Sequence, residues 1–452
     1  RDRTTGTAVK DACYVEDGSE TAEKTAYSNV YADSAEWAAW QEKWKTIRNN
    51  YEQIALTPGE NATKMNFAWY CVTEEIPKIK LMDSQGRVIQ EVQGQQNLAN
   101  KETITENDNV ITLIPNKVTV SGLAENTSYQ YQYYLDGAWS DTYTFETKST
   151  ENFSVMYVGD PQIGASVGQD DNSKEYHAMN DAYNWNHTLS SALSAHSNVS
   201  FILSAGDQIN QTSVSKDADK LEQQIEYAGF LSSPLLRSMP VATTIGNHDS
   251  GSAAYNQHFN LPNESADKGQ TTAGSDYWFV YENTLFINLN SNDRSTAEHK
   301  AFIEEAIAAN PNVKWKTVVF HHSIFSTASH VDDGDIITRR NELPQVFKDL
   351  DIDVVLMGHD HVYTRTYMMD GTTPDTSKGV QSSDTNPTGI LYLTANSASG
   401  SKYYDIKAPN AEYSAKMDQS YRRTVTDIKV TDTSYTMKTY YADDLSLFCL
   451  LY

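Results

Sequence analysis

Cysteine is scarce in this 452-residue chain, and long hydrophobic runs are missing from it. The three cysteines, Cys13, Cys71 and Cys449, are odd in number and widely spaced, which excludes a disulfide framework and the spacing of a zinc site. One bridge that leaves one free thiol stays open. No apolar run approaches the roughly 18 residues that a membrane helix needs, so we expect no membrane span.

Positive charge is also in short supply. Lys and Arg number 35 against 60 Asp and Glu, which gives a formal net charge of −25. This balance argues against a surface that neutralises nucleic-acid phosphates and against binding to an anionic membrane. It leaves room for a small phosphorylated substrate held locally by metal cations. The oligomeric state stays open.

The chain begins at Arg1 rather than at a methionine, as it would after removal of a signal peptide, either biologically or by cloning. It also carries seven Asn-x-Ser/Thr sequons, which are acceptor sites for N-glycosylation in secreted proteins. We therefore expect a secreted, cell-surface or periplasmic protein. The sequons begin at Asn61, Asn126, Asn152, Asn186, Asn198, Asn210 and Asn263.

Residues 34–51 carry apolar side chains at alternating spacings of three and four, which places them on one face of a helix. Ser34 is a suitable N-cap for this helix. The aromatic stripe predicts that the helix packs on a neighbouring domain, and we assign residues 1–54 to the N-terminal segment that contains it. The stripe consists of Trp37, Trp40, Trp44, Ile47 and Tyr51.

The apolar pattern changes to a period of two after residue 55. Alternation in KMNFAWYC and in SYQYQYYL, followed by a DG turn, is typical of strands joined in hairpins. Residues 55–149 are therefore predicted to form an all-β sandwich of the fibronectin type III or immunoglobulin type.

From residue 150 to residue 452, short apolar runs alternate with helix-like segments. This alternation predicts a layered α/β domain with a buried sheet. Residues 370–388 are rich in turn-forming residues and are predicted to be a loop. The apolar runs are FSVMYVGD, VSFILSAGD, VATTIGNHD, TLFINLNS, KTVVFHH, IDVVLMGHDH and GILYLTANS.

Five of these predicted strands end in residues that bind metals. Ligands in open α/β sheets bind beyond the carboxyl ends of the strands, so these side chains are expected to converge. Carboxylate, amide and imidazole donors suit first-row transition metals, and one carboxylate can bridge two such ions. The residues are Asp160, Asp207, Asn247 with His248, His321, and His359 with His361. Glycine precedes four of these positions, as close backbone approach requires, at Gly159, Gly206, Gly246 and Gly358.

The ordered blocks GD, GDxx, GNHD, VxxH and GHxH span roughly residues 155–365 and resemble the calcineurin-like metallophosphoesterase superfamily. The ending GHDHVYTRTY is similar to that of its purple acid phosphatase branch, as is a β domain that begins near LTPGE. The resemblance implies an α/β sandwich, with α/β/α layers around two mixed sheets, after a fibronectin-like domain. It also implies two bound metal ions, with Fe, Mn and Zn as the candidates.

The resemblance also implies roles for individual residues. His248 corresponds to the histidine that contacts phosphate and protonates the leaving oxygen, and His330 to a histidine of the substrate pocket. Asn247, His248, Tyr363 and Arg365 are candidates for substrate binding, with bracing of a loop as the alternative for Arg365. Around the metals it implies Asp160, Asp207 and His361 for one ion, and Asp207 as a bridge with Asn247, His321 and His359 for the other.

Two departures from the family pattern concern the first metal. Purple acid phosphatases carry an iron-binding tyrosine where this chain has Asn210, so we expect no tyrosinate colour. Other members place a histidine where this chain has Gln162. Gln162, Asn210 or water is expected to fill the gap. His322, beside His321, is expected either to support the site or to pack.

The resemblance implies an enzyme that hydrolyses phosphate monoesters through a metal-activated hydroxide, without a phosphoenzyme. A phosphodiesterase or nucleotidase that uses the same residues is the first alternative. The alternative of another class is an adhesion or binding protein whose phosphoesterase domain is inert.

Overall fold

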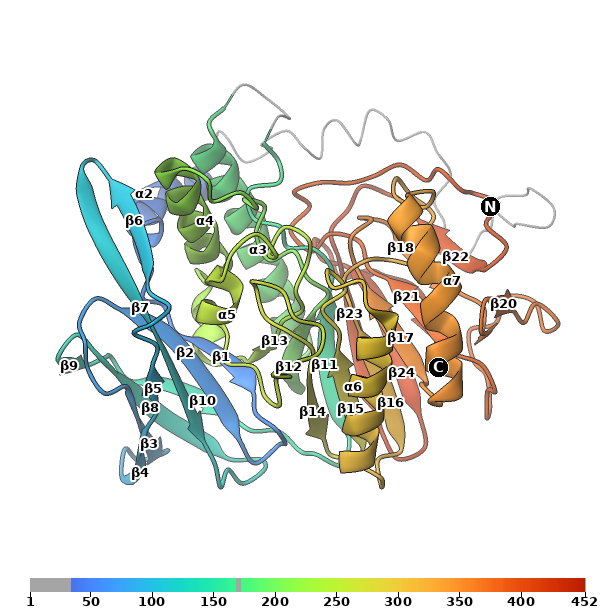
Figure 1. Ribbon diagram of the computed structural model, residues 1–452, viewed down its shortest axis with the longest axis horizontal. Coiled ribbons are helices and arrows are strands. Elements are labelled where there is room, and N and C mark those ends of the chain that lie inside the picture. The colour runs from blue at the N-terminus through green and yellow to red at the C-terminus, as the bar shows by residue number, and fades with distance from the viewer. Residues whose placement is uncertain (1–33, 168–171, 452) are drawn as a thin grey trace.

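The structure is a computed structural model that describes residues 34–167 and 172–451 (Figure 1). Residues 1–33 of the predicted N-terminal segment, and Cys13 with them, lie outside the described residues. Cys71 is a buried free thiol. Within the described ranges, no helix combines the length and the apolar character needed to cross a bilayer.

The predicted amphipathic helix is present as α2 (Ala35–Ile47). The Ser34 side chain accepts a hydrogen bond of 3.0 Å from the backbone N–H of Trp37, which caps the helix. The aromatic face packs on α3 (Lys174–Ala195), where the rings of Trp37 and Tyr183 meet edge to face at 5.3 Å. The prediction of a docked helix is therefore confirmed.

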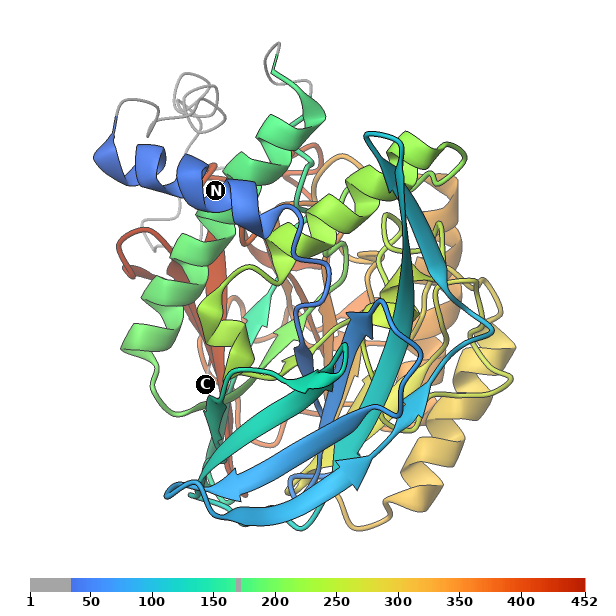
Figure 2. The same cartoon turned by 90° about the vertical axis from the view of Figure 1, so that its left-hand side faces the viewer.

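Two antiparallel sheets follow α2 and enclose a core of their own (Figure 2). Alternating side chains of β8 (Ser128–Leu135) supply the tyrosines of this core, as the period of two predicted. One sheet contains β1 (Ala55–Pro58), β2 (Met65–Cys71), β5 (Gln95–Gln96), β6 (Glu102–Glu106) and β7 (Asn109–Val120). The other contains β3 (Lys78–Asp83), β4 (Val88–Gln93), β8, β9 (Ala138–Trp139) and β10 (Tyr143–Glu146).

The α/β part contains two mixed sheets that pack face to face through a shared core. The six-stranded sheet has the order β13 (Val241–Ala242), β12 (Val199–Ser204), β11 (Phe153–Val158), β23 (Thr424–Val430), β24 (Tyr435–Tyr441), β25 (Leu447–Leu451). The seven-stranded sheet has the order β14 (Tyr277–Tyr281), β15 (Thr284–Asn288), β16 (Trp315–Val319), β17 (Val354–Met357), β21 (Leu391–Thr394), β18 (Tyr363–Thr366), β22 (Ser414–Asp418). A two-stranded ribbon, β19 (Met369–Asp370) with β20 (Thr373–Pro374), lies at the start of the predicted loop.

Helices cover the outer faces of both sheets (Figure 1). α3 and α4 (Asp217–Phe230) pack on the six-stranded sheet, while α6 (Thr296–Ala309) and α7 (Gly334–Asp349) pack on the seven-stranded sheet. The short helices η1 (Pro234–Arg237) and α5 (Ala254–His258) lie next to the β domain. The predicted fold class, a layered α/β part after an all-β domain, is confirmed.

The β domain is fastened to the α/β part by buried polar contacts. Tyr131 donates from its hydroxyl to the carbonyl of Arg237 at 2.8 Å, and Tyr70 donates to Gln257 Oε1 at 2.5 Å. The hairpin of β6 and β7 also extends along α4 (Figure 2). Since these donors are buried, separating the two parts would leave them without partners.

Candidate metal centre

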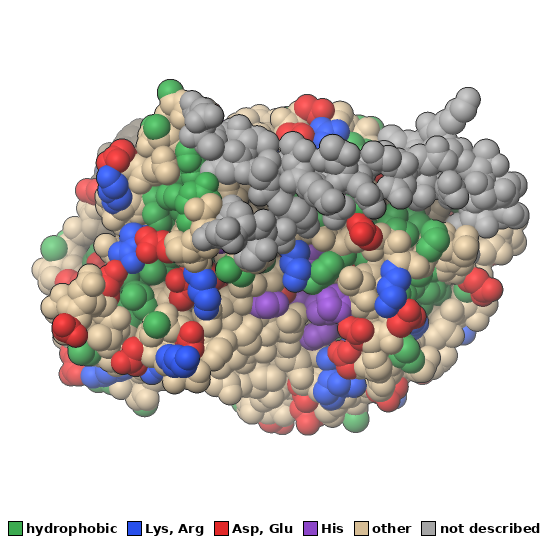
Figure 3. All heavy atoms as spheres, turned by 90° about the horizontal axis from the view of Figure 1, so that it is seen from above, with side chains coloured by type: hydrophobic (Ala, Val, Ile, Leu, Met, Phe, Trp, Pro, Cys, Tyr) green, Lys and Arg blue, Asp and Glu red, His purple; other side chains and the backbone are tan. Residues whose placement is uncertain are grey.

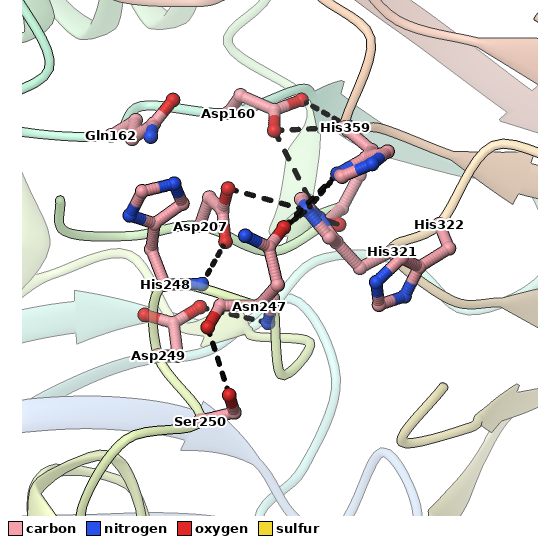
Figure 4. Close-up of polar contacts among 12 residues, drawn as sticks. Asp160, Gln162, Asp207, Asn247, His248, Asp249, Ser250, His321, His322 and His359 are labelled. Carbon is pink, nitrogen blue, oxygen red and sulfur yellow. Dashed lines mark hydrogen bonds and ion pairs between the residues drawn. The ribbon is translucent and has the colours of Figure 1, made fainter. Parts of the chain in front are cut away.

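The predicted metal ligands follow the carboxyl ends of parallel strands in both sheets. β11, β12 and β13 run parallel in one sheet, and β16, β17 and β21 run parallel in the other. Loops from the two sheets therefore meet at one edge of the sandwich. Figure 4 shows the side chains from these loops turned toward one another.

The backbone is strained at this edge. Asp160, Gln162, Asp207, His359 and His361 all have positive φ angles, of 35°, 32°, 50°, 72° and 42°. A non-glycine residue in this region costs on the order of 1–3 kcal/mol, and such residues cluster at functional sites. The strain thus coincides with four of the six predicted metal ligands.

Glycines let the loops approach one another closely. A Cβ atom on Gly246 would lie 2.0 Å from Asp207 Oδ1, and one on Gly358 would lie 2.6 Å from Asp160 Oδ2. Any side chain at these two positions would therefore displace a carboxylate of the site. The expectation of close backbone approach is confirmed at both.

Four potential ligand atoms meet at His321. Its Nδ1 lies 2.9 Å from the carbonyl of Ala205, to which it can only donate, so the lone pair of the neutral ring is on Nε2. That Nε2 lies 3.0 Å from Asn247 Oδ1, 3.2 Å from Asp207 Oδ2 and 3.2 Å from His359 Nδ1 (Figure 4). Without a metal, a proton on an imidazole nitrogen is needed to hold these atoms so close. A metal ion would satisfy all four.

Asp160 and His361 extend the cluster. His361 donates from Nδ1 to the carbonyl of Lys402 at 2.8 Å, which leaves Nε2 facing Asp160 Oδ1 at 3.7 Å. This is the arrangement that metal-binding histidines adopt, with the far nitrogen fixed by a carbonyl. Asp160, Asp207 and His321 together offer ligand atoms within 4.8 Å of one another, and all three are buried.

The electrostatics of the cluster demand a positive charge. Burial raises the pKa of Asp160 well above its ordinary value. Burial disfavours a charged His321 ring, yet Asp207 and Asp160 raise its pKa to about 9. Burial lowers the pKa of His361 to about 3, and burial with the surrounding histidines holds that of His359 well below its ordinary range. Two neutral imidazoles therefore present lone pairs beside two buried carboxylates, which is a donor set that suits divalent metal ions.

Gln162 and Asn210 occupy the positions at which the family pattern is broken. Gln162 donates from Nε2 to Asn210 Oδ1 at 3.2 Å. Gln162 Oε1 is then buried without a hydrogen-bond partner, two residues along the chain from the predicted ligand Asp160. An orphaned buried oxygen costs roughly 1–3 kcal/mol. The Gln162 oxygen is thus available to a ligand, whereas the Asn210 oxygen already accepts from Gln162.

The two predicted catalytic histidines lie at the centre. His248 has Nδ1 2.6 Å from the carbonyl of Asn210, and its backbone N–H donates to Asp207 Oδ1 at 2.9 Å. The ring of His330 lies 4.3 Å from that of His359, and its Nδ1 contacts Asp333 Oδ2 at 2.7 Å. Both histidines are thus close to the cluster and are oriented by a fixed partner.

The remaining predicted residues lie at the margin of the cluster. His322 contacts Ser291 Oγ at 2.7 Å and packs its ring 4.8 Å from that of His359. Arg365 is buried in β18 and donates from Nη2 to the carbonyl of Gln381 at 2.8 Å, which corresponds to its loop-bracing alternative. Tyr363 is also buried in β18, with its ring 4.9 Å from that of Phe448.

Several carboxylates that hold the site together were missed by the sequence analysis. Asp249 accepts from the backbone N–H of Gly246 at 2.9 Å and from Gln208 Nε2 at 2.7 Å, and so ties two ligand loops together. Asp360 accepts from the backbone N–H of His330 at 3.0 Å. Both stand inside the motif blocks GNHD and GHDH, so the signal was present in the sequence.

Two more missed carboxylates lie beneath the loops, where no motif marks them. Glu226, on α4, accepts from the backbone N–H of Asn210 at 2.8 Å. Asp181, on α3, accepts from the backbone N–H of Gly164 at 2.9 Å. The two helices thereby hold the loops that follow the two aspartates.

Comparison with known proteins identifies the two parts of the chain. Residues 153–363 match the calcineurin-like phosphoesterase family, and residues 51–147 match the purple acid phosphatase N-terminal domain. The chain therefore contains a calcineurin-like phosphoesterase domain. The preceding β domain is of the purple acid phosphatase N-terminal type. The family implies divalent metal ions at a dinuclear site.

Solved structures share this fold. Purple acid phosphatase PPD1 from yellow lupin (Lupinus luteus) seeds has a TM-score of 0.67 at 14% identity, over 88% of this chain and 74% of that chain. PhoD has a TM-score of 0.52 at 11% identity, over 89% of both chains.

Two uncharacterized proteins of Mycobacterium tuberculosis, from strains CDC 1551 / Oshkosh and ATCC 25618 / H37Rv, are 24% identical over 145 residues. These matches cover 28% of this chain and 26% of each relative, so the chain spans about a quarter of their length.

Proposed function

We propose that the protein hydrolyses phosphate monoesters at a dinuclear metal centre. The observation that carries this proposal is the convergence of carboxylate, amide and imidazole groups around His321 Nε2, a donor set that suits a metal ion. When bound, a pair of metal ions supplies Lewis-acid stabilisation and a hydroxide nucleophile near neutral pH. The proposed ligands are Asp160, Asp207, Asn247, His321, His359 and His361, with Asp207 between the two ions.

The proposed extra ligand of the first metal is Gln162 Oε1. Its burial without a partner supports this assignment over Asn210, whose oxygen already accepts from Gln162. His322 is proposed to hold the ring of His359 in place, since the two rings are in contact.

His248 is proposed to bind the phosphate and to hold the proton that the leaving oxygen receives. Donation from Nδ1 to the Asn210 carbonyl fixes the ring, so that Nε2 is the nitrogen available for proton transfer. His330 is proposed to assist at the side of His359, because Asp333 orients its ring. Asn247 is both a ligand and a substrate contact in this proposal. Tyr363 and Arg365 are assigned to support of the site, because both are buried within β18.

The finer organisation of the chain is also proposed. The segments are residues 1–54, a β-sandwich of the fibronectin type III kind over 55–149, and a catalytic domain over 150–452. Two antiparallel sheets around a separate core support the sandwich assignment. A secreted or surface location is proposed on the sequons and on the substrate class.

The test combines metal analysis with two substrates. Protein purified without chelator is expected to contain about two metal ions per chain and to cleave p-nitrophenyl phosphate. Asp207→Ala should lose both the metal and the activity, because it removes the shared carboxylate. Cleavage of bis(p-nitrophenyl) phosphate alone would favour a phosphodiesterase. A protein that takes up neither manganese, iron nor zinc and turns over neither ester would sink the enzyme assignment in favour of a binding protein.

A further inference from the structure

The segment after β21 brings a lysine and a tyrosine to the metal centre that no motif marks. Lys402 and Tyr404 are half-buried and Tyr403 between them is buried. The ring of Tyr404 lies 5.2 Å from that of His361 and 5.3 Å from that of His330. Lys402 Nζ lies 4.8 Å from the centre of the Tyr404 ring.

The segment is fixed to the ligand loops rather than loosely placed. The Lys402 carbonyl accepts from His361 Nδ1 at 2.8 Å. Gln419 donates from Nε2 to the carbonyl of His361 at 2.6 Å and to that of Tyr404 at 2.5 Å. Ser397, at the start of the same segment, donates to the Asp160 carbonyl at 2.9 Å. The position of Lys402 relative to the ligands is therefore set by the backbone.

The ammonium group of Lys402 has no counter-ion among the described residues, where it forms no ion pair and donates no hydrogen bond. The ammonium group of Lys402 and the rings of His361 and His330 all contact the same Tyr404 ring. Basic side chains lie beside the exposed histidines on this face of the molecule (Figure 3).

Metal binding would change the net charge around Lys402. Two divalent ions would neutralise Asp160 and Asp207 and leave an excess of positive charge next to an unpaired ammonium. An anion is then needed to compensate both. A phosphate monoester is a dianion with three oxygens that are not esterified, whereas a diester has a single negative charge. The surplus of positive charge favours the monoester.

We propose that Lys402, held in place by Tyr404, contacts a non-reacting oxygen of the bound phosphate and makes the site selective for phosphate monoesters over diesters. This inference rests on the proposed phosphoesterase function. Lys402 is a substrate-binding residue in this scheme, and Tyr404 is a positioning residue that acts through cation–π contact with the ammonium.

The first experiment removes the charge of Lys402 and keeps its length. In Lys402→Met, kcat/KM for p-nitrophenyl phosphate is expected to fall about tenfold to a hundredfold, as for a lost hydrogen bond to a charged group. The value for bis(p-nitrophenyl) phosphate should fall much less, and Lys402→Arg should retain most of the selectivity. Lys407→Met is the matched control, since Lys407 lies on the same segment, is exposed and pairs with Asp332 at 3.4 Å. It should behave as wild type.

The second experiment measures the binding of inorganic phosphate, which involves no catalytic turnover. Calorimetric titration of inorganic phosphate into the metal-loaded protein should show Lys402→Met binding at least about tenfold more weakly than wild type, with unchanged metal content. Tyr404→Leu should also weaken phosphate binding, but should add little in the Lys402→Met background, because it acts through the lysine.

The outcomes separate the two proposals. Unchanged phosphate affinity and unchanged ester selectivity in Lys402→Met would overturn the role of Lys402, while the phosphoesterase assignment would stand. Loss of metal in Lys402→Met would show a structural role and would also overturn it. If wild type turned over neither ester, the phosphoesterase assignment would fail, and the phosphate titration alone would decide the role of Lys402.

Discussion

Single glycines set the geometry of the centre, because the backbone at these positions lies very close to neighbouring groups. Four glycines precede the ligand positions, each within one of the short motif blocks that the sequence carries. The approach at Gly246 is the tightest of the four, because its Cα faces the carboxylate that both metals are proposed to share. A single methyl group is therefore sufficient to test the assignment.

Gly246→Ala is expected to lower metal affinity by at least about tenfold, since its Cβ would displace Asp207. Gly334→Ala is the control, because a Cβ there meets nothing within 4 Å. Metal content after dialysis against a weak chelator, measured by elemental analysis, gives the comparison. Equal metal retention in the two variants would contradict the proposed place of Asp207.

The sequence predicted the converging ligands because each follows a strand end within a short block. It could not predict Lys402, which lies in SASGSKYYD, 41 residues after His361, with no spacing that ties it to the site. Glu226 and Asp181 could not be predicted for the same reason. They reach the loops from helices α4 and α3, and only the packing of those helices on the sheet brings them there.

Secondary-structure elements were predicted well wherever their period was clear. The helix α2 and the alternating strands of the β domain follow directly from spacings of 3.6 and 2. The strands β23 and β24 were not predicted. Their alternating sequences TVTDIKV and YTMKTYY carry the signal, but nothing local shows that they complete the six-stranded sheet beside β11.

Helix α5 carries a buried histidine into the contact between the β domain and the α/β part. His258 lies between Tyr70 of β2 and Tyr227 of α4, with ring distances of 4.8 and 4.2 Å. Its Nε2 lies 2.9 Å from Gln224 Oε1. Its burial disfavours the charged form of the ring.

This burial makes the stability of the protein sensitive to acid. Burial lowers the pKa of His258 from 6.5 to about 3. Below pH 6.5 the unfolded chain binds a proton that the folded protein does not, so the stabilisation is complete above that pH and is lost as the pH falls toward 3. Between pH 8 and pH 5 this loss is about 2 kcal/mol.

The measurement is urea unfolding of wild type and His258→Gln at pH 8 and at pH 5. The fall in unfolding free energy should be smaller in the variant by about 2 kcal/mol, whatever its stability at pH 8. The same fall in both proteins would show that His258 is protonated in the folded state.

At the scale of the whole molecule, the centre joins two sheets. Asp160, Asp207 and Asn247 come from the six-stranded sheet, while His321, His359 and His361 come from the seven-stranded sheet. A metal that binds both groups binds only the folded protein. It therefore stabilises the sandwich by mass action in addition to any chemistry.

Removal of the metal with a chelator is expected to lower the unfolding free energy by about 4 kcal/mol if free metal was a thousandfold above its dissociation constant. The chelator should leave the stability of Asp207→Ala unchanged, because that variant has little metal to lose. Thermal unfolding followed by circular dichroism makes the comparison. A chelator effect of equal size in the two proteins would place the stabilising metal elsewhere.

The amide pair of Gln162 and Asn210 has a consequence for oxidation chemistry. Its two neutral side chains stand where relatives supply an anionic phenolate or an imidazole, so the proposed ligand set carries two negative charges, from Asp160 and Asp207. An iron ion without a phenolate is easier to reduce, because the trivalent state loses its anionic partner. The proposed donor set, with two carboxylates and no phenolate, is thus matched to two divalent ions rather than to a ferric ion.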